Sequence, residues 1–161
     1  MRKVIAAINM TLDGFCDHTA IIPDEEIHHH YADLLNNAGV VLYGRITYQL
    51  MQFWQTLLKN SSGEETMDDF AMALDKIPKI VFSRTLKSTG WESAKLANRT
   101  IEEAVLELKQ QSGKNIFVGS RSLIIQLIKL NLIDEYQLMV HPVVAGSGLP
   151  LFEKHKRQNY S

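Results

Sequence analysis

The sequence predicts an α/β protein, a single domain built on a mainly parallel sheet. Short apolar runs alternate along the chain with segments of helical periodicity, which is the pattern of right-handed βαβ units. The runs are almost uninterrupted in apolar residues, as expected for strands that are buried on both faces. The length of 161 residues, with no repeat or low-complexity tract, suits one domain with one core.

The predicted strands are the apolar runs at residues 3–9, 40–43, 79–82, 115–118 and 135–143. Helical periodicity predicts helices at residues 23–36, 46–58, 67–74, 101–111 and 120–130. Pro23 and the acidic residues after it suit the first turn of a helix, where free N–H groups carry partial positive charge. Thr100 and Glu103 form a capping box.

Composition excludes several classes of protein. The formal net charge is −1, whereas a protein that binds nucleic acid or an anionic membrane usually carries a basic surplus. The single cysteine, Cys16, cannot form an internal disulfide, which fits a reducing compartment. The apolar run near the N-terminus is too short for a signal peptide or a membrane span. We therefore expect a cytoplasmic protein with a small-molecule substrate.

Three strand-to-helix junctions share one pattern, in which Gly or Ser is followed by Arg and then by a hydroxyl residue. They are Gly44-Arg45-Ile46-Thr47, Ser83-Arg84-Thr85 and Gly119-Ser120-Arg121-Ser122. The carboxyl ends of the strands form the ligand crevice in open α/β sheets, and helix N-termini and arginines bind phosphate. The pattern predicts a ligand with several phosphates, such as a dinucleotide. The alternative is that Gly and Ser only form tight turns beside solvated arginines.

Motifs along nearly the whole chain resemble those of the dihydrofolate-reductase-like superfamily, in particular the reductase domain of riboflavin biosynthesis. They are Thr11-Leu12-Asp13-Gly14-Phe15, Leu42-Tyr43-Gly44-Arg45-Ile46-Thr47-Tyr48, Leu132-Ile133-Asp134-Glu135-Tyr136, His141-Pro142-Val143 and Gly146-Ser147-Gly148-Leu149-Pro150-Leu151-Phe152. The resemblance implies that superfamily's three-layer fold, with helices on both faces of the sheet. It also implies the cofactor NADPH.

The same resemblance implies a set of cofactor-binding residues. Those for the pyrophosphate are Gly44, Arg45 and Thr47. Those near the adenosine 2′-phosphate are Ser83, Arg84 and Thr85. The second phosphate turn consists of Gly119, Ser120, Arg121 and Ser122, and the residues beside the nicotinamide are Ala7 and Asn9. The second phosphate turn departs from the family pattern, because Val118 stands where a first glycine is common.

Carboxylates at two places in the sequence are candidate proton donors. Pro23-Asp24-Glu25 resembles the spacing of the folate enzymes, which makes Glu25 the candidate and Asp24 its reserve. A carboxylate in an apolar cleft has a raised pKa, which suits proton delivery; the alternative is an exposed acidic first turn. Asp13 is the second candidate, by resemblance to the riboflavin-type relatives, and its alternative is a turn-forming Asp-Gly.

Three consecutive histidines at 28–30 do not predict a metal site, because successive helical residues turn by about 100° and fan around the axis. His28 follows Asp24 by one helical turn and is a candidate for lining the same cleft. We therefore expect no bound metal.

The expected function is hydride transfer from NADPH to a small heterocycle, either pterin- or folate-like or similar to 5-amino-6-(5-phosphoribosylamino)uracil. The alternative is a nucleotide-binding module without catalysis. Proteins that this chain resembles continue past the Phe152 region into further strands, whereas residues 1–161 form one reductase-like domain without them. The edge beside residues 135–143 is then open, and an open edge is a template for pairing. Two explanations stay open: the sequence is cut short of its last strands, or a second copy covers the edge. Because homodimers are the commonest assembly, we expect a homodimer at that edge.

Overall fold

The computed structural model of the protein describes residues 1–16 and 24–152. Its centre is a six-stranded sheet in the order β4-β3-β2-β5-β1-β6, in which every pairing is parallel. The strands are β1 (Val4–Thr11), β2 (Ala38–Gly44), β3 (Lys79–Phe82), β4 (Ala94–Leu96), β5 (Asn115–Val118) and β6 (Glu135–His141). The predicted parallel sheet is confirmed, so the carboxyl ends of all these strands lie at the same side of the sheet.

The helices largely follow the predicted ranges. They are α1 (Glu25–Asn36), α2 (Arg45–Met51), η2 (Gln52–Gln55), α3 (Thr56–Lys59), α4 (Glu65–Lys76), α5 (Ile101–Gln110) and α6 (Arg121–Lys129). The helix predicted over 46–58 is divided by the 3₁₀ turn η2. Asp24 caps α1 by accepting a hydrogen bond from the Ile27 N–H, and Thr100 caps α5 in the same way. Pro23, expected to begin the first helix, lies outside the described residues.

Sequence analysis missed the edge strand β4. Its three residues, Ala94–Leu96, are too few to show an apolar run. The strand is held by backbone hydrogen bonds to β3, from the Lys79 N–H to the Ser93 carbonyl and from the Ala97 N–H to the Val81 carbonyl. Tertiary pairing, rather than local propensity, therefore fixes this strand.

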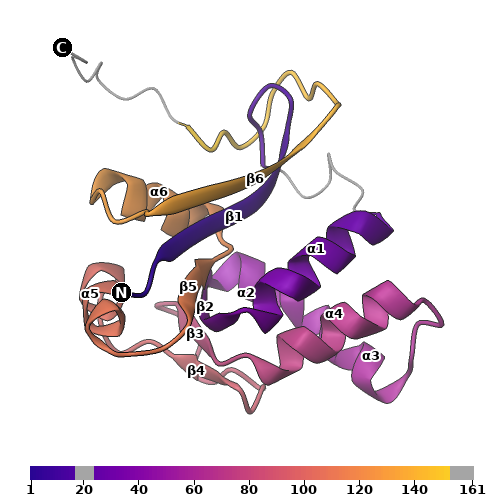
Figure 1. Ribbon diagram of the computed structural model, residues 1–161, viewed down its shortest axis with the longest axis horizontal. Helices are drawn as coiled ribbons and strands as arrows, with labels where there is room; N and C mark the ends of the chain where they lie inside the picture. Colours follow the sequence, from indigo (N-terminus) through magenta and orange to yellow (C-terminus); the bar gives the residue numbers. More distant parts are fainter. Residues whose placement is uncertain (17–23, 153–161) are drawn as a thin grey trace.

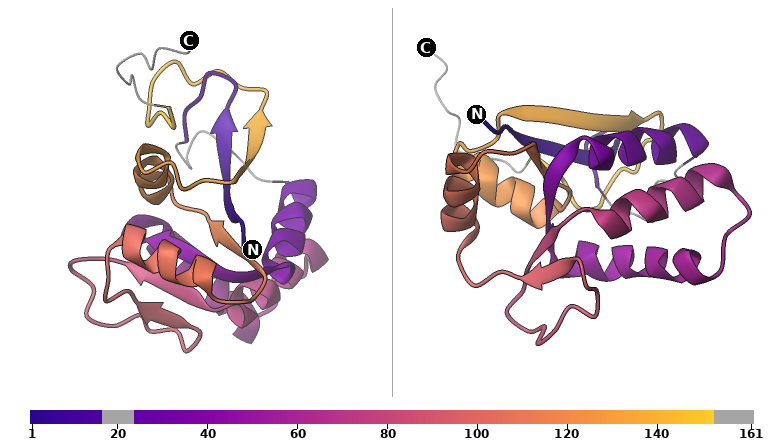
Figure 2. Two further views of the ribbon diagram at one scale, coloured as in Figure 1. Left: turned by 60° about the vertical axis from the view of Figure 1, so that its left-hand side comes forward. Right: turned by 60° about the horizontal axis from the view of Figure 1, so that its bottom comes forward.

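Helices cover both faces of the sheet, with α1, α2 and α4 on one side and α5 and α6 on the other (Figures 1 and 2). Each side contains its own buried core. Neighbouring residues of one strand enter different cores, as Ala6 and Ala7 do in β1 and Leu42 and Tyr43 do in β2. This explains the unbroken apolar runs of the sequence, because side chains of a strand alternate between two buried faces. The three-layer fold expected from the resemblance is confirmed.

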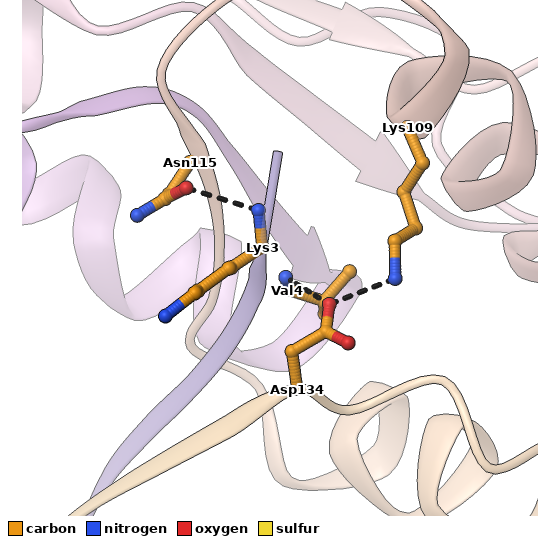
Figure 3. Close-up of polar contacts among 5 residues, drawn as sticks. All are labelled: Lys3, Val4, Lys109, Asn115 and Asp134. Atoms are coloured by element: carbon orange, nitrogen blue, oxygen red, sulfur yellow. Dashed lines mark hydrogen bonds and ion pairs between the residues drawn. The ribbon is translucent and has the colours of Figure 1, made fainter. Parts of the chain in front are cut away.

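A polar cluster anchors β1 at the amino ends of the strands (Figure 3). Asp134 accepts hydrogen bonds from the Val4 N–H and from the Lys109 ammonium, each at 2.8 Å, and Asn115 accepts one from the Lys3 N–H. Burial opposes ionisation of Asp134, but these hydrogen bonds and the nearby lysine charges lower the pKa of its carboxyl. Asp134 of the C-terminal motif is thus a structural residue, at the opposite end of the sheet from the phosphate junctions.

Within the described residues, β6 pairs with β1 alone and forms one edge of the sheet. Tyr136 and Val140 on this strand are about half exposed. The charged run at 153–157 lies outside the described residues. The homodimer at this edge stays a prediction. In the described part of the chain, no helix has the length and apolar character needed to cross a membrane.

Candidate functional site

A polar cleft of about 810 Å³ opens at the carboxyl ends of β2, β3 and β4, beside the first turns of α2, α5 and α6. Its charged lining residues are Arg45, Arg84, Arg99 and Glu103. Three guanidinium groups outnumber two carboxylates, Glu103 of the lining and Glu107 beside Arg99, which leaves the cleft with a net positive charge that attracts an anionic ligand. The volume lies within the usual range for small-molecule sites.

The three arginines differ in how firmly the protein holds them. Arg99 forms an ion pair with Glu107 at 2.7 Å, and Arg45 donates to the side-chain carbonyl of Gln49 at 3.2 Å. No described residue forms a hydrogen bond or ion pair with the Arg84 guanidinium. Arg84 is therefore the cleft arginine whose full hydrogen-bonding capacity is open to a phosphate group.

An apolar cavity of about 340 Å³ lies next to the polar cleft, between the sheet and the layer of α1, α2 and α4. Trp54 and Phe70 form part of its wall in an edge-to-face contact, with ring centroids 4.6 Å apart. Tyr31 and Tyr43 also line it, and burial raises the pKa of both phenols well above the usual value. The two tyrosines therefore remain protonated. None of the described lining residues is an Asp or a Glu.

The cleft and the cavity share three lining residues, Ile46, Thr47 and Ser122. Thr47 belongs to the first turn of α2, and Ser122 to the first turn of α6. A long ligand that is charged at one end and flat and apolar at the other could thus pass from the cleft into the cavity between these two helix starts.

Two of the predicted phosphate junctions are joined by a buried hydrogen bond. The Gly44 N–H donates to the Ser120 hydroxyl at 2.7 Å, and Ser120 is only 1% exposed. A Cβ on Gly119 would lie 2.9 Å from ring atoms of both Tyr43 and Phe117, so this position requires glycine. Ser120 and Gly119 therefore set the spacing between the two junctions. Gly119 also lines the apolar cavity, whereas Ser120 lines neither the polar cleft nor the apolar cavity.

The Ser83-Arg84-Thr85 junction forms a tight turn in which the Ser83 hydroxyl accepts from the N–H groups of Thr85 and Leu86. Ser83 and Arg84 line the polar cleft and Thr85 does not; their binding of a 2′-phosphate stays a prediction. The Ser83 hydroxyl is engaged by the backbone, so its contribution to the cleft is mainly to direct Arg84.

Three of the predicted cofactor-binding residues line the apolar cavity rather than the polar cleft, namely Ala7 and Asn9 of β1 and Arg121 of α6. Ala7 presents a small, 1% exposed wall, and the Asn9 side-chain oxygen lies 3.3 Å from His141 Nε2. The Arg121 Nε donates to the Pro150 carbonyl at 2.8 Å, which holds the C-terminal loop beside the cavity. Leu149 of that loop also lines the cavity.

Neither predicted proton donor lines the apolar cavity. Glu25 is exposed on the first turn of α1. Asp13 accepts hydrogen bonds from the Thr11 hydroxyl and from the N–H groups of Ala145 and Gly146. These bonds lower the pKa of Asp13 to about 2, and an ionised carboxylate is a poor acid near neutral pH. Glu25 thus lies in an acidic first turn and Asp13 in an Asp-Gly turn, and the role of either residue as a proton donor stays a prediction.

The three histidines of α1 fan around the helix. His29 is exposed and lies 3.4 Å from the Asp33 carboxylate, and His30 is exposed as well. His28 points inward and lines the apolar cavity. In the parts of the chain that are described, no three His, Cys, Asp or Glu side chains gather into a possible metal site.

A fourth junction was missed by sequence analysis. Asn98, Arg99 and Thr100 follow β4 and line the polar cleft. They repeat the pattern of a small polar residue, an arginine and a hydroxyl. The pattern itself was available in the sequence, but it could be placed at a strand end only once the short strand β4 was known.

Comparisons with known proteins place this chain among relatives of similar sequence and fold. The family model of the RibD C-terminal domain matches residues 2–160. The uncharacterized protein YyaP of Bacillus subtilis is 35% identical over 159 residues, covering 94% of this chain and 80% of YyaP. YwjB of the same organism, also uncharacterized, is 29% identical over 160 residues, covering 95% and 84%. A crystal structure of a protein from Shewanella sp. PV-4, provisionally assigned to riboflavin biosynthesis, has the same fold, with a TM-score of 0.64. The two chains are 18% identical, and the match covers 96% of this chain and 85% of the Shewanella chain.

Proposed function

Because the chain belongs to the RibD C-terminal domain family, we propose that it is an NADPH-dependent reductase that transfers a hydride to a small heterocyclic substrate. The observation that carries the proposal is the meeting of an arginine-rich cleft with an apolar, aromatic cavity. A nicotinamide dinucleotide has two matching parts, one that bears the phosphates and one flat ring that must be kept from water.

The residues of the polar cleft fit the phosphates of such a cofactor. Arg45 and Thr47 would hold the pyrophosphate from the start of α2, with Ser122 opposite them on α6. Arg84 would bind the 2′-phosphate, because its guanidinium is the least engaged by the protein. Arg99, with its ion pair to Glu107, would contribute a fixed positive charge beside it.

The apolar cavity would enclose the reacting ends of cofactor and substrate. When bound, NADPH supplies a hydride from its nicotinamide ring. Ala7 leaves room for a flat ring against β1, and Asn9 offers a polar contact at its edge. Trp54, Phe70 and the half-buried Tyr31 exclude water and stack on a planar substrate. Pterins, folates and uracil derivatives all meet this requirement for a flat heterocycle.

One observation favours a second candidate, a nucleotide-binding module without catalysis. The described lining of the apolar cavity contains no carboxylate that could deliver a proton, and the phosphate-binding residues do not need one. Such a module would bind NADPH and reduce nothing.

A reductase screen separates the two candidates. NADPH consumption is followed by absorbance over pterins, flavins and pyrimidine precursors, in the parent protein, in Arg84→Ala and in the control Lys87→Ala, whose exposed cation lies outside the cleft lining. We expect substrate-dependent NADPH consumption that Arg84→Ala weakens and Lys87→Ala preserves. NADPH binding without turnover of any substrate would favour the module, and the absence of NADPH binding would refute both candidates.

A further inference from the structure

One polar group in the wall of the apolar cavity has an unusual environment. His28, on the inner side of α1, packs against Trp54 and Phe70 with ring centroids 5.4 and 6.2 Å away. Its Nδ1 is fully buried and has no hydrogen-bond partner among the described residues. Buried polar atoms without a partner are rare and call for an explanation.

The two ring nitrogens of His28 are not equivalent. A proton on Nδ1 would be enclosed by the aromatic rings without an acceptor, which is the more costly way to bury an imidazole nitrogen. Nε2 forms no hydrogen bond with a described residue, and His28 lines the apolar cavity. In a neutral imidazole one nitrogen donates and the other accepts. The environment therefore favours the tautomer that carries its proton on Nε2, where it can donate to a ligand in the cavity.

The rest of the cavity lining does not favour an amino edge. The hydroxyl groups of Tyr31 and Tyr43 can both donate and accept hydrogen bonds. The Arg121 side chain donates through Nε to the Pro150 carbonyl, and no described lining residue adds a carboxylate. An aminopyrimidine edge presents paired N–H donors, which a carboxylate would bind, whereas a carbonyl edge presents acceptors. The cavity suits the carbonyl edge.

We propose that His28 selects the substrate of this protein by donating a hydrogen bond from Nε2 to the carbonyl oxygen that a dioxopyrimidine ring carries where an aminopyrimidine carries its amino group, in a planar heterocycle packed against Trp54 and Phe70. The inference rests on the proposed function only in taking this cavity as the substrate site.

Pterin and lumazine form a matched pair of probes, because these two bicyclic heterocycles share the C4 carbonyl and differ only around C2. Pterin carries an amino donor at C2 and an unprotonated N1, whereas lumazine carries a carbonyl acceptor at C2 and an N1–H. Calorimetric titration of the full chain, with and without NADPH, should show tighter binding of lumazine than of pterin. We expect a difference of about threefold to tenfold, the range of one hydrogen bond. Equal binding, tighter binding of pterin, or binding of neither compound would overturn the proposal.

Two variants test the role of the imidazole. His28→Phe keeps a ring between Trp54 and Phe70 but removes the donor, and should abolish the preference for lumazine. His28→Gln places an amide donor near the position of Nε2 and should restore much of it. The control His29→Phe makes the same change on the exposed side of α1 and should bind both probes like the parent. If His28→Phe still binds lumazine more tightly than pterin, the role assigned to the His28 imidazole is contradicted.

An NADPH titration of each variant separates this inference from the proposed function. If NADPH binds but lumazine is not preferred, the role of His28 is refuted and the proposed function stands. If lumazine is preferred but NADPH does not bind, the proposed function fails and the selection by His28 stands. A His28→Phe protein that does not fold leaves the decision to His28→Gln and to the comparison of the two probes in the parent.

Discussion

Replacing Ser120 with Ala tests the link between the two phosphate junctions. In the parent, the buried Gly44 N–H donates to the Ser120 hydroxyl at 2.7 Å, and Ser120 is 1% exposed. The substitution leaves a buried donor without its acceptor, which costs about 1–3 kcal/mol of the free energy of unfolding. In a domain of this length, that cost corresponds to a fall in Tm of roughly 2–12 °C.

Urea denaturation and thermal unfolding of Ser120→Ala measure this cost directly. Ser122→Ala is the matched control, because it removes a hydroxyl from the same turn that is exposed and faces the cleft and the cavity. Its unfolding free energy should stay within about 0.5 kcal/mol of the parent, as for most surface substitutions. If Ser120→Ala were as stable as Ser122→Ala, the buried hydrogen bond would not hold the junctions together, and our account of their spacing would be wrong.

Three further predictions concern the cofactor, pH and assembly. Arg84→Ala should narrow the preference for NADPH over NADH by about 1–3 kcal/mol in parallel titrations, and an unchanged preference would remove Arg84 from the 2′-phosphate site. In the folded protein the pKa of Asp13 is lowered from 3.8 to about 2, so the ionised carboxylate stabilises the fold above about pH 4. This stabilisation is lost as the pH falls toward 2. The urea midpoint of Asp13→Asn should therefore depend less on pH over that interval than the urea midpoint of the parent. Light scattering should give twice the chain mass of 18.3 kDa, and Val140→Lys on the β6 edge should give the monomer; a monomeric parent contradicts the predicted homodimer.

The helices and strands that could be predicted from the sequence are those whose own residues show an apolar run, a helical periodicity or a capping residue. Strand β2 is an unbroken apolar run because its side chains enter two cores, and α5 has its cap at Thr100. Strand β4 is different, since its three residues are defined by pairing with β3. The same limit applies to the site, where Arg99 was overlooked because the strand before it was not recognised.

The inner wall of the apolar cavity could be predicted only in part. The sequence placed His28 one turn after Asp24 and indicated that it could face a cleft, but it could not show which face of α1 turns toward the sheet. Glu25 fits the spacing of a related family, yet helix α1 is oriented so that this carboxylate is exposed. Similarly, the Ser120 hydroxyl fitted a phosphate turn, but tertiary packing directs it to the Gly44 N–H.

The central claim is that the arginine-rich cleft binds the phosphates of NADPH. Isothermal titration of the parent protein with NADPH and with NADH, at fixed ionic strength, tests it most directly. Our account predicts saturable binding with one site per chain and a tighter Kd for NADPH, because only NADPH carries the 2′-phosphate that Arg84 would contact. The absence of binding, or equal Kd values for the two cofactors, would contradict it.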